Sequence, residues 1–420
     1  MTHRKSAALL SIIPGLGQFY NKQWVKGSVF LFLAACYFIA FLDFLNIGLW
    51  GIVTLGTEVP RDHSIFLLVN GVISLIVVAI GLGFYALNFY DAYQNGKKRD
   101  MGLQLNTLRE QYHNVIDKGF PYLMVGPGFL LLVFVVIFPI IFMLLLSFTN
   151  YNLYNSPPNK LVDWVGLQTF IEMFTLDIWR ETFISVFAWT IIWTFTATTL
   201  QIGVGIFLAV LLNQKDLKFK GLMRTLLILP WAVPAFVSIL IFSGLFNDTF
   251  GAINNDILAA VGIDSIPWMT DPFYTKIALI FIQSWLGFPF VMAMTTGVLQ
   301  SIPGELYEAA TVDGASTWDK FKKITLPMIL FTTAPILITQ YTFNFNNFNV
   351  IYLFNNGGPA VPDQNAGGTD ILISWIYNLT MTSAQYSKAA AVTVMLSIII
   401  VSVALYNFRK TKSFKDEGMI

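Results

Sequence analysis

Eight long apolar stretches constrain this chain more than any other feature of its sequence. They lie at about residues 27–45, 64–90, 121–148, 183–212, 222–246, 277–299, 328–354 and 389–408. A helix needs roughly 20 apolar residues to cross the hydrocarbon core of a bilayer. With 55% hydrophobic and only 12% charged residues, the 420-residue chain is not a soluble globule. We therefore expect an all-α fold, a polytopic membrane protein with about eight transmembrane helices.

Basic residues between these stretches predict the orientation of the chain. Of the 25 Lys and Arg residues, 20 lie in the two ends and in alternate connections, namely 1–26, 91–120, 213–225, 300–326 and 407–420. The other connections hold only Arg61, Lys160, Arg180, Lys276 and Lys388. By the positive-inside rule, the basic set faces the cytoplasm. Both termini are therefore expected to be cytoplasmic.

A polar and basic segment, 91–118, divides the chain near residue 120. It separates the first two spans from the other six. We expect residues 1–120 to form an N-terminal two-span membrane unit with a basic cytoplasmic linker, and residues 121–415 to form the main membrane domain. Residues 14–27 combine turn-forming glycines with aromatic and lysine side chains, which suits a membrane interface and indicates no catalytic role.

The charged segment 301–327, which lies between two uncharged spans, predicts a helix-turn-helix. A short helix is expected over 304–312, followed by a turn at 313–315. Ser316 and Asp319 have the spacing of a capping box that opens a second helix. The final proline of the segment predicts a bend where this helix enters the next span.

The same segment resembles the EAA loop of ABC importer permeases. The shared pattern is a Glu-Ala-Ala triplet, then a glycine after three residues, then Ile-x-Leu-Pro after nine more. In that family the loop is the coupling helix that docks on an ATPase subunit. The resemblance implies that 121–415 is a type I ABC importer permease core with 301–327 as its coupling loop. The positions implied in ATPase coupling are Glu308, Ala309, Ala310, Asp313, Gly314, Ile324, Leu326 and Pro327.

The chain itself is not expected to be an enzyme. It lacks the G-x-x-x-x-G-K-[ST] phosphate loop, and its three histidines are scattered over different segments. No catalytic residue, metal site or cofactor is therefore expected, and the resemblance assigns ATP and Mg²⁺ to partner ATPase subunits. The net charge of +1, without a basic face, also argues against a nucleic-acid partner.

Span 328–354 carries amides that are unfavourable against lipid. Gln340, Phe343, Asn344 and Asn347 recur at i, i+3, i+4 and i+7, which places them on one stripe of a helix. Such amides bind neighbouring helices or face a wet cavity. Two interpretations stay open. The stripe either makes interhelical hydrogen bonds or forms a site in which amides bind sugar hydroxyls and aromatic rings cover the sugar's apolar face.

Prolines predict irregular backbone in two other spans. Gly287 and Pro289 should distort span 277–299, and Pro230 and Pro234 should interrupt span 222–246. Either irregularity alone is compatible with a simple kink. Broken helices at membrane depth often surround a transport site, and three polar or irregular spans together favour such a site.

Four stretches resemble MalF-type permease subunits of maltose/maltodextrin ABC importers. They are WAVPAFVSILIFSGLFN (231–247), WLGFPF (285–290), TFNFNNF (342–348) and NNGGP (355–359). The resemblance implies substrate contacts at Trp231, Ala235, Gln283, Trp285, Leu286, Gly287, Phe290, Gln340, Phe343 and Asn344. Five of these positions depart from the family example: Trp231, Ala235, Gln283, Phe290 and Gln340. The exact sugar therefore stays open.

The resemblance also implies the setting in which the chain works. It implies a bacterial cytoplasmic membrane, a second homologous permease subunit, two ATPase subunits and an extracytoplasmic sugar-binding protein. Residues 149–182 are too few for the large extracytoplasmic domain of the enterobacterial version, which suggests a lipid-tethered binding protein. The expected function is translocation of maltose/maltodextrin-type oligosaccharides by alternating access.

Two alternatives stay open. Within importers, the solute can be another oligosaccharide, a sugar derivative or a glycerol-phosphate-like solute, although an anion would favour Lys or Arg and the matching positions have neither. From a different class, an ion-coupled secondary sugar transporter needs an ionisable group in the membrane. Spans 277–299, 328–354 and 389–408 contain no Asp, Glu, Lys or Arg.

Overall fold

The computed structural model describes residues 2–117, 119–214 and 217–410. These residues form helices joined by loops, with two isolated bridges and no strand. The chain divides into two compact units, Met1–Thr169 with Gln385–Val394 (unit 1) and Phe170–Ala384 with Met395–Ile420 (unit 2). The all-α class is confirmed. The functional boundary near residue 120 stays a prediction.

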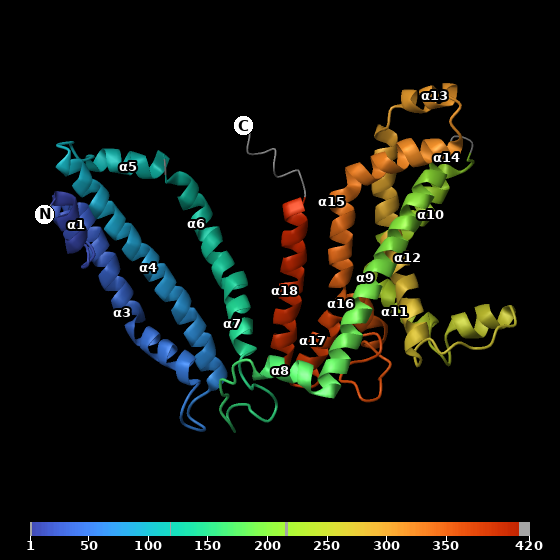
Figure 1. The fold of residues 1–420 in the computed structure, drawn as a ribbon, viewed down its shortest axis with the longest axis horizontal. Coiled ribbons are helices and arrows are strands. Elements are labelled where there is room, and N and C mark those ends of the chain that lie inside the picture. Colours follow the sequence, from blue (N-terminus) through green and yellow to red (C-terminus); the bar gives the residue numbers. More distant parts are fainter. Residues whose placement is uncertain (1, 118, 215–216, 411–420) are drawn as a thin grey trace. The chain divides into compact units, whose positions relative to one another are not determined.

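Unit 1 is built on two long helices, α3 and α4, which pack along each other (Figure 1). Its helices are α1 (His3–Leu10), α2 (Leu16–Tyr20), α3 (Trp24–Thr54), α4 (Ser64–Asp100), α5 (Leu108–Asp117), α6 (Phe120–Leu132) and α7 (Phe138–Leu146), with a π turn at Val133–Ile137. The contact between α3 and α4 depends on small residues. A Cβ added at Gly71 would lie 2.4 Å from the Cβ of Ile52, so a larger side chain would separate the helices.

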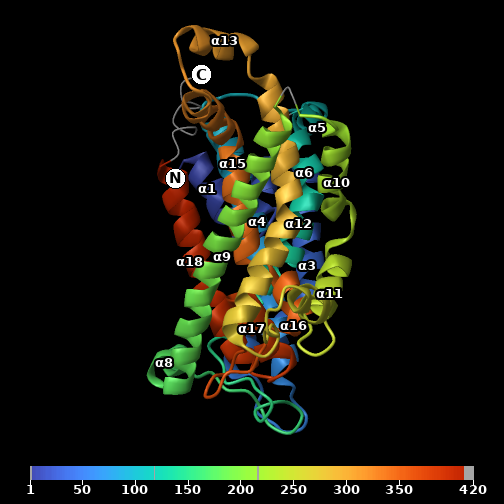
Figure 2. The same ribbon diagram turned by 90° about the vertical axis from the view of Figure 1, so that its right-hand side faces the viewer.

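Unit 2 is organised around α9 and α12, which pack along each other, with α15 against α9 (Figure 2). Its helices are α9 (Asp177–Leu212), α10 (Lys220–Ala232), α11 (Ala235–Leu245), α12 (Pro272–Ser301), α13 (Gly304–Val312), α14 (Thr317–Lys320), α15 (Leu326–Phe345), α16 (Phe348–Asn355) and α17 (Leu372–Met381), with π turns at Ile253–Leu258 and Phe321–Thr325. The short α8 (Gln168–Thr175) precedes α9, and α18 (Tyr386–Lys410) ends the described chain.

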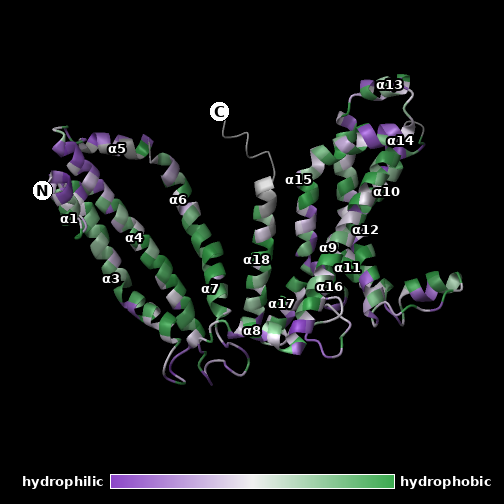
Figure 3. Ribbon diagram, viewed as in Figure 1, coloured by the Kyte–Doolittle hydropathy of each residue, from purple (hydrophilic) through white to green (hydrophobic). Residues whose placement is uncertain are grey.

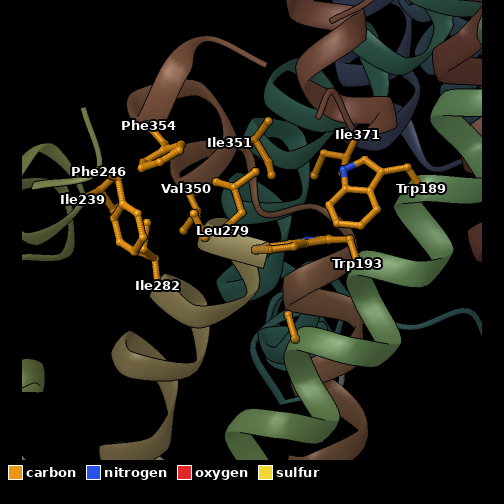
Figure 4. Close-up of a cluster of buried hydrophobic side chains, with 12 residues drawn as sticks. Trp189, Trp193, Ile239, Phe246, Leu279, Ile282, Val350, Ile351, Phe354 and Ile371 are labelled. Atoms are coloured by element: carbon orange, nitrogen blue, oxygen red, sulfur yellow. The ribbon is translucent and has the colours of Figure 1, made fainter. Parts of the chain in front are cut away.

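A cluster of buried side chains holds one end of unit 2 together (Figure 4). Trp189 and Trp193 of α9 meet Leu279 and Ile282 of α12 and Ile351 of α16 in this cluster. The indole N–H groups are not left unpaired, because they donate to two backbone carbonyls at 3.0 and 2.9 Å. Large aromatic side chains with satisfied polar atoms therefore fix the three helices to one another.

The helices coincide with the eight apolar stretches of the sequence. Six helical segments are long and apolar enough to cross a membrane, namely Trp24–Thr54, Ser64–Asp100, Phe120–Leu146, Asp177–Leu212, Pro272–Ser301 and Thr317–Asn355. The pair α10 and α11 forms a seventh candidate, bent by 92° at its break. The eighth stretch falls on α18, whose apolar part, Tyr386–Ser402, is shorter. The orientation of the termini stays a prediction.

The proline predictions had different outcomes. The break between Pro230 and Pro234 is confirmed, because α10 ends at Ala232 and α11 begins at Ala235. At Gly287 and Pro289, α12 stays helical through both residues, so no break forms there, and the distortion stays a prediction. Here α9 packs along α12 so closely that a Cβ at Gly205 would lie 2.6 Å from the Cβ of Val291. Close packing against α9 helps α12 to remain helical although Pro289 removes one of its backbone hydrogen bonds.

The predicted amide stripe does not lie on one continuous helix. The helix α15 ends at Phe345, and Asn347 precedes the first residue of α16. Asn344 therefore lies on α15, whereas Asn347 lies in the break between the two helices. Sequence periodicity missed this break because it assumes unchanged helical geometry through the Asn-rich segment.

Candidate functional site

The segment 301–327 forms the predicted helix-turn-helix. Helix α13 is followed by Gly314 at φ +78°, and a capping box between Ser316 and Asp319 opens α14. The Tyr307 hydroxyl lies 2.9 Å from the Thr325 hydroxyl, so a side-chain contact also joins α13 to the π turn that follows α14. Figure 1 shows the chain turning between α14 and α15, close to the predicted bend.

The surface of this hairpin is exposed and mixed in character. Polar residues gather along α13 and α14 (Figure 3). Two apolar side chains on these helices are also exposed: Val312 of α13 is 88% exposed and Trp318 of α14 is 67% exposed. Such exposure is unusual for apolar side chains of this size. Among the predicted coupling residues, Glu308, Ala309, Asp313, Gly314 and Pro327 are exposed, whereas Ala310, Ile324 and Leu326 are half-buried. The hairpin therefore presents a compact, exposed surface.

Five side-chain amides meet between α9, α12 and the α15–α16 break, and we call them the amide cluster. They are Gln201, Gln283, Gln340, Asn344 and Asn347. The Gln201 Oε1 atom accepts from Gln283 at 3.0 Å and from Asn344 at 3.4 Å, while its amide nitrogen donates to Gln340 at 3.3 Å. Asn347 donates to Gln283 at 2.8 Å and to Asn344 at 3.3 Å. The amide groups thus meet one another's need for hydrogen-bond partners inside the helix bundle.

Sequence reasoning missed Gln201, which is the centre of this cluster. Gln201 is fully buried, and its side chain lies where a Cβ on Gly287 would clash at 2.1 Å. Thr198, one turn earlier on α9, accepts from the Asn344 amide at 2.8 Å. The available signal was a single amide in the apolar sequence of α9, but nothing in a linear pattern identifies its partners on two other helices.

We expect Gln201→Leu to weaken the packing of unit 2. The substitution leaves the buried amide N–H of Gln283 without its acceptor, and an unpaired buried donor costs about 1–3 kcal/mol. The melting temperature of the purified chain should fall accordingly. Gln214→Leu is the matched control, because Gln214 is exposed near the end of the same helix. Equal melting temperatures for the two variants would contradict a structural role for the amide cluster.

The ten predicted substrate residues fall into three groups according to their burial. Gln283 and Asn344 are buried in the amide cluster, so interhelical hydrogen bonding accounts for their side chains. Trp231, Trp285 and Phe343 are 57%, 42% and 61% exposed, and Ala235 is also exposed. The other four, Leu286, Gly287, Phe290 and Gln340, are half-buried.

Aromatic contacts link part of the exposed group. Trp231 of α10 meets Phe290 of α12 edge to face, with ring centroids 6.1 Å apart. Trp285 of α12 contacts Phe242 of α11 at 6.3 Å in the same way. The two halves of the bent span therefore each place an aromatic ring against α12. Exposed aromatic faces in this position are suited to cover the apolar face of a sugar ring.

The NNGGP stretch has a structural explanation. Gly357, at φ +77°, approaches the buried Asp370 carboxylate so closely that a Cβ would lie 2.1 Å from its oxygen. This carboxylate accepts from the Gly367 N–H at 2.9 Å and from the Ser374 hydroxyl at 2.7 Å. Burial raises the pKa of Asp370, and these hydrogen bonds oppose the shift. The stretch thus shapes the loop between α16 and α17.

Comparison with known proteins identifies the family. The family model of the binding-protein-dependent transport system inner membrane component matches residues 201–412. The chain is 63% identical to the galactooligosaccharides transport system permease protein GanP of Bacillus subtilis (strain 168), with 100% of both chains covered. It is 50% identical to the maltodextrin transport system permease protein MdxF of the same organism, over 99% of this chain and 98% of MdxF.

A solved structure agrees in fold. A chain from the crystal structure of a bacterial ABC transporter involved in the import of the acidic polysaccharide alginate superposes with a TM-score of 0.58 at 21% identity. The match covers 70% of this chain and 96% of that one. The matched family model and the full-length relatives show that this chain belongs to the binding-protein-dependent transport system inner membrane components, the multi-pass membrane permeases of ABC importers.

Proposed function

We propose that this chain is the permease subunit of an importer that moves neutral oligosaccharides across the cytoplasmic membrane by alternating access. The observation that carries the proposal is full-length similarity to two permeases whose names specify oligosaccharide transport. The site chemistry supports it, because exposed Trp285 and Phe343 lie on α12 and α15, which also bear residues of the amide cluster. The ten predicted site residues include no cation, which fits an uncharged solute.

Two sugar classes are candidates for this permease. The sequence resemblance predicts maltodextrins, and one relative at 50% identity is named for them. Galactooligosaccharides are the second candidate, and the 63% identity to GanP favours them. Uptake of labelled maltotriose and of a labelled galactotriose by the reconstituted complex decides between the two. Uptake of neither sugar would contradict the proposed function.

The substrate contacts divide according to burial. We assign the direct sugar contacts to the exposed or half-buried residues Trp231, Ala235, Trp285, Leu286, Gly287, Phe290, Gln340 and Phe343. Gln283 and Asn344 act from behind them, because their hydrogen bonds set the spacing of α9, α12 and α15. In such a site the polar groups would fix the orientation of the bound sugar, and the aromatic rings would supply most of the contact surface.

Coupling to ATP hydrolysis is assigned to the hairpin. Exposed Val312 and Trp318 suit insertion into a cleft on an ATPase subunit. The hairpin continues through the π turn Phe321–Thr325 into α15, which carries Gln340 and Asn344. Movement of the docked hairpin therefore moves the helix that bears part of the site. Two conformations of this arrangement would open the site to opposite sides in turn.

The partners follow from this mechanism. The chain would assemble with a second homologous permease subunit and two ATPase subunits, which supply ATP, Mg²⁺ and the hydrolytic chemistry. An extracytoplasmic sugar-binding protein, tethered by lipid, would deliver the oligosaccharide. In the spanning segment Phe120–Leu146, no residue of the most apolar 18-residue stretch is buried within this chain. These side chains are therefore available to lipid or to a partner subunit.

The proposed topology places the hairpin in the cytoplasm. A single cysteine at Lys322 should not react with an impermeant thiol reagent in intact cells, whereas one at Lys160 should react. Both lysines are exposed in the structure, so accessibility within the chain does not limit either reaction. The native Cys36 is replaced beforehand because it is also exposed. Labelling at Lys322 from outside would reverse the orientation.

A further inference from the structure

A polar cavity lies in unit 1, and none of its lining residues is assigned to transport. Its volume is about 570 Å³. The lining residues are His3, Arg99, Gly102, Leu103, Gln104 and Leu105. They come from the start of α1 and from the turn that follows α4. Neither sugar contact nor ATPase coupling accounts for this cavity.

The walls of the cavity are held in place by local interactions. The His3 side chain lies 2.9 Å from the Asn21 amide oxygen and stacks on Tyr20, with ring centroids 4.4 Å apart. The Asp100 carboxylate accepts the backbone N–H groups of His3 at 2.8 Å and of Arg4 at 3.2 Å. The beginning of α1 is thereby fixed to the end of α4. The first backbone N–H groups of α1 are therefore already paired and are not available to a ligand.

The turn after α4 also lines the cavity. Gly102 adopts φ +69°, and the Leu103 N–H donates to the Lys98 carbonyl at 2.9 Å. This is a helix-ending pattern in which a left-handed glycine folds the chain back over the last helical turn. Lys98 also lies 3.5 Å from the Asn106 side-chain oxygen, which holds the segment against the helix.

Basic residues lie at and around the cavity, and one of them, Arg99, lines it. The last turn of α4 carries Lys97, Lys98 and Arg99, and α1 adds Arg4 and Lys5. Among these, Arg4 lies 3.9 Å from Asp100. The Nε atom of Arg99 is buried and has no hydrogen-bond partner among the described residues. A guanidinium N–H without an acceptor is suited to bind an anionic group.

The lining also distinguishes between anions. Leu103 and Leu105 add apolar side chains to the lining, and Leu103 is 55% exposed. Polar residues cover this end of unit 1, next to the long apolar part of α4 (Figure 3). Basic pockets at the ends of transmembrane helices bind anionic lipid headgroups. We propose that this cavity binds the phosphate headgroup of an anionic phospholipid, with Arg99 on the phosphate and the leucines against the glycerol carbons.

Native mass spectrometry of the full-length purified chain tests the proposal. The probes are phosphatidylglycerol, zwitterionic phosphatidylcholine and inorganic phosphate, each added alone. The wild type should retain phosphatidylglycerol in preference to phosphatidylcholine. Arg99→Gln should lower this retention by at least about fivefold, since a charge-assisted bidentate contact is lost. Arg99→Lys keeps the positive charge but cannot donate two parallel hydrogen bonds to a phosphate, so it should show retention between that of Arg99→Gln and that of the wild type.

Lys97→Gln is the matched control, because Lys97 is exposed on the same helical turn and does not line the cavity. It should change retention by less than about twofold, as expected for a surface charge. Equal losses in Lys97→Gln and Arg99→Gln would overturn the proposal, since surface charge alone would then hold the lipid. Retention of inorganic phosphate without a preference for phosphatidylglycerol would also overturn it and assign a free-phosphate site. His3→Gln provides a second variant if Arg99→Gln does not fold.

Discussion

Replacing Gly314 with isoleucine is expected to abolish transport while the chain still inserts into the membrane. Gly314 lies at φ +78°, where a β-branched residue is strained by about 1–3 kcal/mol. The turn would rearrange and move α14 relative to α13, which destroys the surface proposed to dock on the ATPase. Sugar-stimulated ATP hydrolysis by the reconstituted complex should fall by at least about tenfold, the equivalent of ~1.4 kcal/mol.

Gly304→Ile is the control for this prediction. Gly304 opens α13 in the same hairpin, and like Gly314 it has no atom within 4 Å of an added Cβ. Its φ is not positive, so only the backbone conformation distinguishes the two positions. Gly304→Ile should retain transport. If Gly314→Ile shows normal sugar-stimulated ATP hydrolysis, the hairpin does not couple the subunits.

Asn344→Ala is expected to weaken the transport site about 5- to 150-fold, which corresponds to a loss of ~1–3 kcal/mol for a buried hydrogen-bonding amide. Asn344 is fully buried, and it donates to Thr198 and accepts from Asn347. Removing it opens the amide cluster behind the sugar contacts. Asn349→Ala is the control, because Asn349 is exposed on α16. The readouts are sugar affinity and the melting temperature of the assembled complex.

These two readouts separate the interpretations that the sequence left open. A lower melting temperature with unchanged sugar affinity would make Asn344 a packing residue only. Trp285→Ala tests the exposed contacts, and Phe281→Ala is its matched control one turn away, because both rings contact Phe242. Trp285→Ala should lower affinity more than Phe281→Ala. Equal effects would place the sugar elsewhere.

Local features were predictable from the sequence because their causes lie within a few residues. Apolar length determined the spans, and the capping box of Ser316 and Asp319 formed as predicted. The bend between α10 and α11 also followed from proline chemistry, which acts on the adjacent backbone.

Features set by contacts between distant segments were not predictable. Pro289 leaves α12 continuous because α9 supports it, and Gln201 acquires its partners only when three helices meet. The interruption at Asn347 is explained by a bond to Gln283, 64 residues earlier in the chain. No periodicity within one span contains that information.

The chemistry of the amide cluster has a consequence for motion between helices. A carboxylate paired with an ammonium inside a bilayer loses a large stabilisation when the two are pulled apart. A carboxamide carries a donor and an acceptor on one short group, so a rotation about its final bond exchanges one neighbour for another. The five amides in contact across α9, α12 and the α15–α16 break therefore each have several amide neighbours with which they can pair. The amide cluster therefore holds α9, α12 and α15 together through hydrogen bonds that can exchange partners without separating charges.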